Sequence, residues 1–429
     1  MKVLLISHTP ITTYESMGKT LFSLFFALRP EELCQFYLYP SLPDVAHCGA
    51  YYRITDKDVL RSYATLRVRG GEVFPAVGES APFEHAEDEA LYRNPKNKTP
   101  LRMLLRDGMW RFARWYTRGL RTFIEREKPT AIFVAPGTAK CIYHAALRVA
   151  REYHLPIVSY ICDDYCFVKR PASLLGRLHL RGLQKITARL QGACARSVVI
   201  STSMKEQYEA AFSTPCEVVM TGTSLPIPEA AKVTPSPTAI TYMGNLCFNR
   251  YHSLLAVGRA LDRLNEARGT DFTLDIYSGD TDKDMIDALS EARSIRFHGF
   301  VTGEAYSRVF ENAALFLHVE AFDEDSIDQV KHSVSTKIAD CLASGVPLLA
   351  YGPVTVASMR HLRDNACTLY AATAEELDGM LCRAFFDGDA RRTAAENGLL
   401  TARRYHDREE NSRKIRRIME EVSHENSAN

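Results

Sequence analysis

The chain has 429 residues, more than one hydrophobic core usually supports, and this length fits two domains. Its 53 lysine and arginine residues balance 52 aspartate and glutamate residues, so the overall charge gives no reason to expect nucleic acid as a partner. The 11 cysteines include no CxxC pair, which favours free thiols in a reducing cytoplasm. The apolar start is too short for a signal peptide, and no segment has the roughly 18 uncharged apolar residues of a membrane span. We therefore expect a cytoplasmic protein that is at most peripheral to a membrane.

Short β-branched runs alternate with segments of helical period, and this alternation predicts parallel sheets covered by helices on both faces. In the first half, the expected strands are 3–7, 34–39, 131–135, 156–161, 197–201 and 217–220. The expected helices between them are 19–28, 140–153, 173–191 and 203–212. The predicted fold class is α/β, with two tandem Rossmann-like domains that face each other across a cleft.

A proline-rich stretch divides the two series of elements. Pro226, Pro228, Pro235 and Pro237 exclude a helix or a central strand, so residues 226–238 are the expected linker after an N-terminal domain of residues 1–225. The second domain, 239–389, has expected strands at 239–243, 272–277, 295–297, 314–319, 347–351 and 368–370. Residues 390–429 are charged and helical, and we expect them to lean back onto the first domain.

The loop after the first strand of the second domain is the first candidate site. In doubly wound sheets, ligands bind beyond the carboxyl ends of the strands, and phosphates prefer helix N-termini. Gly244 and Asn245 lie in this loop, and Arg250 stands where the next helix should begin. A guanidinium there can neutralise charge on a departing diphosphate. The alternative is a turn glycine and a surface arginine.

The second candidate site is a helix start. Ser335 and Thr336 suit an N-cap, Lys337 falls in the first turn, and Asp340 follows one turn later on nearly the same face. A carboxylate in that place can accept hydrogen bonds from ribose hydroxyls while the preceding N–H groups hold phosphates. The alternative is an ordinary capped helix with a solvated aspartate.

Two further loops lie in the first half. Gly18 precedes Lys19 and Thr20 as in a phosphate-binding loop, but that motif requires glycine where Thr13 stands, so we reject an ATPase. Asp163 and Asp164 follow an expected buried strand, where they could bind a cation or position an acceptor hydroxyl. Alternatively, one caps the next segment and the other is solvated.

Two motifs give the chain a family resemblance. Residues 335–352, STKIADCLASGVPLLAYG, resemble the signature of retaining GT-B glycosyltransferases of family 4, with Asp340 as the second of two acidic residues. Residues 244–250, GNLCFNR, resemble the family's loop after the first strand of this domain, with Asn245 at its arginine position and Arg250 at its lysine position. His332 stands where the family has its first glutamate, which leaves the transferred sugar undefined. The chain resembles bacterial capsular and cell-surface polysaccharide enzymes, which often have the S-K/T-K variant of this motif.

The resemblance implies transfer of a sugar from a nucleoside diphosphate to a hydroxyl group, with retention of configuration and without a metal or other cofactor. Arg250 and Lys337 would stabilise the leaving diphosphate, and Asp340 would hold the ribose. Ser335 and Thr336 would offer backbone N–H groups, and Gly18 would face the donor from the other domain. The acceptor would be a glycan or a lipid-linked molecule. A sugar-nucleotide 2-epimerase and a non-catalytic nucleotide-sugar-binding protein are the alternatives.

Residues 93–128 form a possible contact with an anionic membrane surface. Arginines alternate there with leucines and aromatic residues, and both tryptophans of the chain, Trp110 and Trp115, lie in this segment. The alternative is a packed surface helix with solvated arginines.

Overall fold

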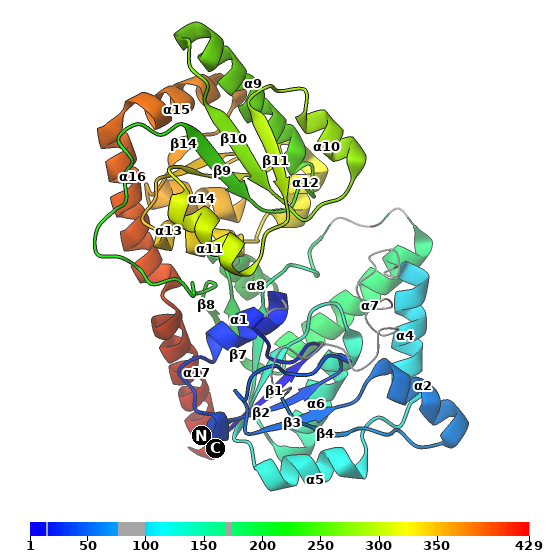
Figure 1. Ribbon diagram of the computed structural model, residues 1–429. Coiled ribbons are helices and arrows are strands. Elements are labelled where there is room, and N and C mark those ends of the chain that lie inside the picture. Colours follow the sequence, from blue (N-terminus) through cyan, green and yellow to red (C-terminus); the bar gives the residue numbers. More distant parts are fainter. Residues whose placement is uncertain (14–15, 76–98, 169–170, 172, 429) are drawn as a thin grey trace. The chain divides into compact units, whose positions relative to one another are not determined.

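Figure 1 shows the computed structural model, which describes residues 1–13, 16–75, 99–168, 171 and 173–428. The chain divides into two compact units, one formed by residues 1–219 and 408–429 and the other by residues 220–407. Each unit contains a largely parallel sheet with helices packed on it, so the predicted α/β class with two Rossmann-like domains is confirmed. No helix in the described part of the chain is long and apolar enough to span a membrane.

The first unit is built on an eight-stranded sheet of order β4-β3-β2-β1-β5-β6-β7-β8. Its strands are β1 (Val3–Ser7), β2 (Leu33–Tyr37), β3 (Ala50–Arg53), β4 (Gly71–Val73), β5 (Ala131–Ala135), β6 (Ile157–Ile161), β7 (Cys194–Val199) and β8 (Cys216–Val218). Among the strands that the structure describes in this unit, only β4 and β3 pair in an antiparallel manner. The strand order reverses direction between β1 and β5, which is where a doubly wound sheet opens a ligand site.

The helices of the first unit are α1 (Ser16–Leu24), α2 (Asp56–Thr65), α4 (Pro100–Phe112), α5 (Arg118–Glu127), α6 (Lys140–Tyr153), α7 (Leu174–Gln191), α8 (Thr202–Phe212) and α17 (Arg408–Ala428). They cover both faces of the sheet because alternate residues of each strand point to opposite faces. Val3 and Leu5 belong to a core with residues of α1 and α17. Leu4 and Ile6 belong to a second core with residues of α5 and α6.

The second unit has a six-stranded, fully parallel sheet of order β11-β10-β9-β12-β13-β14. Its strands are β9 (Ala239–Met243), β10 (Thr273–Tyr277), β11 (Ile295–Gly299), β12 (Phe316–Val319), β13 (Leu348–Tyr351) and β14 (Leu369–Ala371). Its helices are α9 (Arg250–Arg268), α10 (Lys283–Leu289), α11 (Gly303–Asn312), α12 (Glu324–Val330), α13 (Thr336–Ala343), α14 (Ala357–Asp364), α15 (Ala374–Phe386) and α16 (Gly388–Thr401), followed by the π-helical turn Ala402–His406. Here the order reverses between β9 and β12.

The boundary of the second unit differs from the expected one. This unit begins at Met220 and includes α16, whereas the sequence suggested a linker at 226–238 and a separate tail from residue 390. The physical reason is hydrogen bonding: the buried Arg391 of α16 donates to the carbonyl oxygen of Pro235 over 2.8 Å. Thr223 likewise donates its N–H to the carbonyl oxygen of His406 over 2.8 Å. The proline-rich segment is therefore attached along its length to the second unit.

Two buried histidines, His361 and His406, also connect the segment around Thr221 to the rest of the second unit. His406 Nδ1 lies 2.9 Å from the carbonyl oxygen of Thr221, so Nδ1 carries the proton and donates. Its Nε2 must then accept from His361 Nε2, which lies 3.0 Å away. Burial lowers the pKa of His361 to about 3, with a smaller contribution from the charge of His406, and burial lowers the pKa of His406 to about 4. Both rings are therefore neutral in the folded chain.

The free energy of unfolding of the second unit should fall as the pH drops from about 6.5 towards 4. In this range the unfolded chain protonates both histidines, at its ordinary pKa near 6.5, whereas the folded chain does not. Each proton gives a slope of about 1.4 kcal/mol per pH unit. Urea denaturation at several pH values should show a shallower dependence for the double variant His361→Gln, His406→Gln. An unchanged slope in that variant would contradict the assignment.

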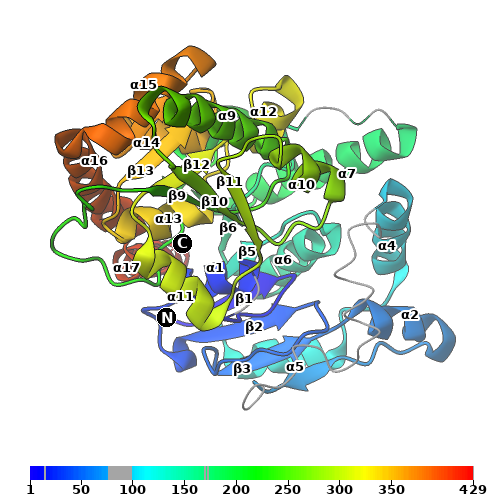
Figure 2. The same cartoon turned by 45° about the horizontal axis from the view of Figure 1, so that its top comes forward.

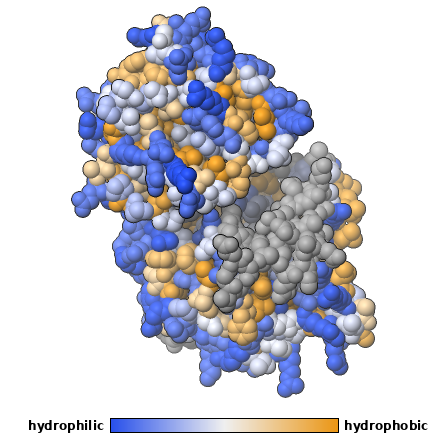
Figure 3. Space-filling view, in the orientation of Figure 1, coloured by the Kyte–Doolittle hydropathy of each residue, from blue (hydrophilic) through white to orange (hydrophobic). Residues whose placement is uncertain are grey.

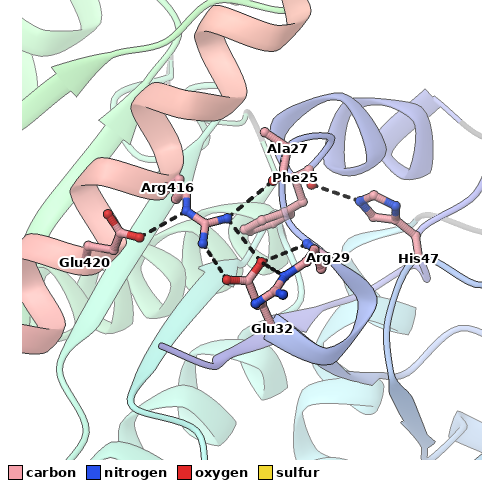
Figure 4. Close-up of polar contacts among 7 residues, drawn as sticks. All are labelled: Phe25, Ala27, Arg29, Glu32, His47, Arg416 and Glu420. Atoms are coloured by element: carbon pink, nitrogen blue, oxygen red, sulfur yellow. Dashed lines mark hydrogen bonds and ion pairs between the residues drawn. The ribbon is translucent and has the colours of Figure 1, made fainter.

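Helix α17 is fixed to the first unit by an ion pair with Glu32. Arg416 on α17 donates from Nη2 to Glu32 Oε1 over 2.5 Å and from Nη1 to Oε2 over 3.1 Å (Figure 4). Burial would raise the pKa of Glu32, but hydrogen bonds from Arg416 and Arg29 outweigh burial and lower it to about 2. The pair is ionised at neutral pH, and it joins residues that are 384 positions apart in the sequence.

Arg416→Ala should lower the free energy of unfolding of the first unit by roughly 2–3 kcal/mol, because it leaves a buried carboxylate without its main partner. Both tryptophans lie in this unit, so urea denaturation followed by tryptophan fluorescence isolates its transition. Arg413→Ala is the matched control, since Arg413 on the same helix pairs with the exposed Glu409 and should contribute less than about 1 kcal/mol. Equal losses in the two variants would rule out the anchoring role.

Candidate functional site

Polar residues gather at the carboxyl ends of β9 and β12, where the strand order of the second unit reverses. β9 ends at Met243 and leads into Gly244 and Asn245, and β12 ends at Val319 and leads into Glu320. Gly244 packs against the ring of Tyr242, whose hydroxyl would lie 2.7 Å from an added Cβ. A side chain at position 244 would therefore collide with this buried ring unless the ring moved. Neighbouring parallel strands bring both loops to one edge of the sheet, the position at which such sheets bind ligands.

An ion pair joins the two loops. Arg250, the first residue of α9, places Nε and Nη2 each 2.9 Å from Glu320 Oε2. Its Nη1 donates to Asn245 Oδ1 over 2.7 Å. The side chains of Arg250 and Glu320 are 12% and 3% exposed. The guanidinium is thus held from two sides and is largely buried.

Glu320 is the charged centre of this network. Ser358 donates its hydroxyl to Glu320 Oε1 over 3.1 Å, and His318 Nε2 lies 3.2 Å from the same oxygen. Burial alone would raise the pKa of Glu320, but contacts with His318, Arg250 and Ser358 hold it below its ordinary value. The carboxylate is therefore ionised, and it orients Arg250. Glu320 was not among the site residues predicted from the sequence.

A cavity of about 150 Å³ opens beside this network. Its lining includes six of the predicted site residues, Gly244, Asn245, Arg250, Ser335, Thr336 and Lys337, together with His318. Ser335 has the extended backbone of an N-cap, but its side chain makes no capping hydrogen bond to α13. The first turn of α13 therefore presents N–H groups that could donate hydrogen bonds to a bound anion. The structure thus brings the two candidate loops of the second domain together.

Two other predicted residues lie outside the lining of this cavity. Asp340 accepts a hydrogen bond from the hydroxyl of Thr223 over 2.7 Å and another from that of Tyr306 over 3.2 Å. Lys337 extends over the ring of the same Tyr306, with Nζ 5.0 Å from the ring centroid. His332 is half-buried in the turn that precedes α13. Asp340 therefore also helps to fix the segment around Thr223 to the second unit.

The predicted residues of the first unit have structural contacts of their own. Gly18 lies in α1, where a Cβ would approach Thr12 Oγ1 to 2.0 Å, so the loop before the helix packs directly on the glycine. Asp164 accepts hydrogen bonds from the backbone N–H groups of Cys166 and Phe167, both over 3.0 Å, and so caps the segment that follows β6. Asp163 is exposed and accepts from the hydroxyl of Tyr165 over 2.9 Å.

The first unit has a larger cavity of about 1070 Å³ at the carboxyl ends of β1 and β5, which sequence analysis did not find. Its lining is mostly apolar and comes largely from α2, α4 and the loop after β5. Three polar residues of the lining contact one another: Arg106 donates to Asp56 over 3.1 Å and lies 2.9 Å from His8 Nε2. This cavity can take a molecule with a polar end and an apolar body.

The described residues include no group of three His, Cys, Asp or Glu side chains arranged to hold a metal ion.

Residues 258–418 match the family model described as glycosyl transferase-like. A search of curated proteins finds no match. Among solved structures, sucrose-phosphate synthase from Thermosynechococcus elongatus has a TM-score of 0.62 at 10% identity and covers 98% of this chain and 99% of its own. HepE from Anabaena, in complex with UDP and glucose, has a TM-score of 0.61 at 11% identity over 98% and 100% of the two chains.

The lipopolysaccharide outer core galactosyltransferase WaaB is similar as well, with a TM-score of 0.58 at 12% identity over 97% and 99% of the two chains. The chain has the GT-B fold. At these low identities the solved structures establish the fold alone, while the family match covers residues 258–418, which is less than half of the chain. The comparisons favour a glycosyltransferase over an epimerase or a non-catalytic binding protein.

Glu320→Gln should lower the free energy of unfolding of the second unit by roughly 2–4 kcal/mol, because the buried guanidinium of Arg250 loses its only charged partner among the described residues. Urea denaturation followed by circular dichroism should show the loss, while the tryptophan transition of the first unit stays unchanged. Glu291→Gln is the control: Glu291 pairs with Arg259 at the surface of the same unit and should contribute less than about 1 kcal/mol. A negligible loss for Glu320→Gln would show that the network does not hold this unit together.

Proposed function

We propose that the chain is a GT-B glycosyltransferase that moves a sugar from a nucleoside diphosphate to a hydroxyl acceptor. The observation that carries this proposal is the cavity where the fixed Arg250 meets the uncapped start of α13. A guanidinium and a set of helix N–H groups together match the two negative charges of a diphosphate. HepE, which shares the fold, is described in complex with UDP and glucose, and this supports the same class of donor here.

Arg250 is the group proposed to stabilise the leaving diphosphate. Glu320 and Asn245 already hold its guanidinium, so little reorganisation is needed as negative charge develops on the leaving group. Lys337 would add a second cation, and the N–H groups near Ser335 and Thr336 would bind phosphate oxygens. With these groups supplying the positive charge, the proposed reaction requires no metal ion or other cofactor.

The remaining assignments rest on the family 4 resemblance. Asp340 would bind ribose hydroxyls with the lone pairs that Thr223 and Tyr306 leave available, and His332 would contact the sugar ring. The same resemblance supports retention of anomeric configuration. We propose that the acceptor and the transferred sugar are contacted by Gly18, Asp163 and Asp164.

The proposed acceptor is a glycan or a lipid-linked molecule of the cell surface. The large apolar cavity of the first unit and the similarity of fold to WaaB, a lipopolysaccharide galactosyltransferase, support this choice. Figure 3 shows hydrophobic atoms along the edge of this unit that carries α4 and α7, where Leu101, Leu105, Leu174 and Leu178 are exposed. An anionic membrane surface is therefore a proposed partner of this edge.

The structure changes one detail of that membrane hypothesis. Trp110 is 3% exposed and donates its indole N–H to Asp56 over 2.6 Å, so it is a core residue and no membrane anchor. Trp115 packs beside it. Of the segment 93–128, residues 93–98 lie outside the described residues, and the exposed leucines of α4 would make the apolar contact.

Incubation of the protein with a panel of nucleoside-diphosphate sugars, with and without glycan and glycolipid acceptors, tests the function. We expect a glycosylated acceptor and free nucleoside diphosphate, formed only when both substrates are present. Conversion of the donor sugar into its epimer without an acceptor would instead identify an epimerase. If no donor is bound or consumed in calorimetry and product analysis, the proposal is wrong.

Arg250→Ala should reduce turnover by roughly 10²–10³-fold, because its charge is needed most when the leaving diphosphate gains charge. Donor affinity should fall much less, so the loss should appear in kcat more than in KM. Arg259→Ala, nine residues further along the same helix and exposed, should leave both constants unchanged. Full turnover by Arg250→Ala would remove this residue from the mechanism.

A further inference from the structure

Helices α4, α6 and α7 of the first unit lie beside one another (Figure 2), and their residues line a basic groove that adjoins the large cavity of this unit at Gly108. Its volume is about 970 Å³. Six lysine and arginine side chains line it, namely Arg111 from α4, Lys140, Arg148 and Arg151 from α6, and Lys185 and Arg189 from α7. Only two carboxylates, Asp107 and Glu152, share the lining. In a chain of net charge +1, this is a strong local excess of positive charge.

Both carboxylates are already engaged by other groups. Asp107 lies 2.7 Å from Lys140 Nζ and 3.2 Å from His179 Nδ1. Glu152 lies 3.1 Å from Arg121 Nε, which belongs to α5 and does not line the groove. Five cations therefore remain without an ion pair to any described residue, and these are Arg111, Arg148, Arg151, Lys185 and Arg189, of which Arg148 lies over the ring of Tyr116. Their charges are balanced only by solvent ions or by a ligand.

His144 gives independent evidence that these cations converge. It lies on α6 and lines the same groove, and it is half-buried. Burial lowers its pKa, and the positive charges of Arg189, Arg111 and Lys140 lower it further, while Asp107 alone acts in the opposite direction. The positive charges of three helices thus affect the same imidazole ring. The fold keeps these cations close together although they repel one another.

We propose that this groove is a binding site for a ligand with two or more phosphoryl groups. Guanidinium groups bind phosphate oxygens in pairs through parallel N–H donors, and a polyphosphate supplies several negative charges in a small volume. The site belongs to the first unit, whereas the proposed diphosphate-sugar cavity belongs to the second, so the inference does not depend on the proposed function.

The phosphoryl groups could be supplied by a soluble compound or by a lipid headgroup. The face of α7 that carries Lys185 and Arg189 continues towards the start of the helix with Leu175 and Leu178, which are 42% and 56% exposed. This apolar extension suits the chain of a phosphorylated lipid. The recognised chemistry is the same in both cases, and the experiment distinguishes the two sources.

Tryptophan fluorescence reports on this groove directly, because Trp110 and Trp115 both line it and the chain has no other tryptophan. Titration with inorganic pyrophosphate should change the emission, and the double variant Lys185→Gln, Arg189→Gln should bind it at least about tenfold more weakly. The control is Arg177→Gln, Arg181→Gln, which removes the same charge from exposed positions of the same helix outside the groove. Its affinity should equal that of the parent protein.

A second measurement compares sedimentation with vesicles of phosphatidylcholine that contain a polyprenyl diphosphate and with vesicles of phosphatidylcholine alone. Binding of pyrophosphate that depends on Lys185 and Arg189 would support a soluble ligand, and binding only to the vesicles with the lipid diphosphate that depends on them would support a lipid. Arg250→Ala should behave like the parent protein in both measurements, which separates this site from the diphosphate-sugar cavity. If neither probe binds, or if the groove variant and its control bind equally, the inference is overturned.

Discussion

The buried pair of Arg250 and Glu320 is the constraint on which the candidate site depends. A buried charge is tolerated only when it is paired, so the start of α9 and the end of β12 must stay together in every folded molecule. The loop between β9 and α9 has constraints of its own. Phe248 and Asn249 both have a φ of 56°, which is costly for residues with a side chain, and Asn249 donates to Asp323 over 3.1 Å. Strain of this kind persists only where surrounding contacts compensate for it, and it is common at binding sites.

The sequence predicted the central strands well, because a parallel strand buried on both faces needs a continuous apolar run. Val3–Ser7, Ala131–Ala135 and Ala239–Met243 were expected with the bounds that the structure has. The edge of the first sheet was missed. Ala50–Arg53 is short and ends in arginine, and Gly71–Val73 is a three-residue antiparallel strand, so neither has the pattern of a buried strand. Their pairing depends on the preformed β2 and not on their own composition.

The candidate site was predictable only where local signals exist. The segment Ser335–Lys337 looks like a helix start, and Arg250 follows a strand and a glycine, so both were found from neighbouring residues. Glu320 is 70 positions from Arg250, and a lone glutamate after a strand gives no sign that it will be buried beneath a guanidinium. The contacts of Asp340 with Thr223 and Tyr306 were equally hidden. They arise from the fold of the whole second unit, which short-range patterns do not contain.

Arg250 and the arginines of the basic groove differ in whether they have a counter-ion within the protein, and this difference affects how each can bind an anion. Arg250 carries its counter-ion within the protein, so its guanidinium is oriented before any ligand arrives, but Glu320 offsets part of its attraction for an anion. The arginines between α4, α6 and α7 have no such partner among the described residues. They attract an anion more strongly at a distance, but each long side chain must lose conformational freedom when it binds. An oriented cation suits a group whose charge develops during a reaction, whereas an unpaired cluster suits a ligand that arrives already charged. The same residue type thus serves two kinds of recognition in one chain.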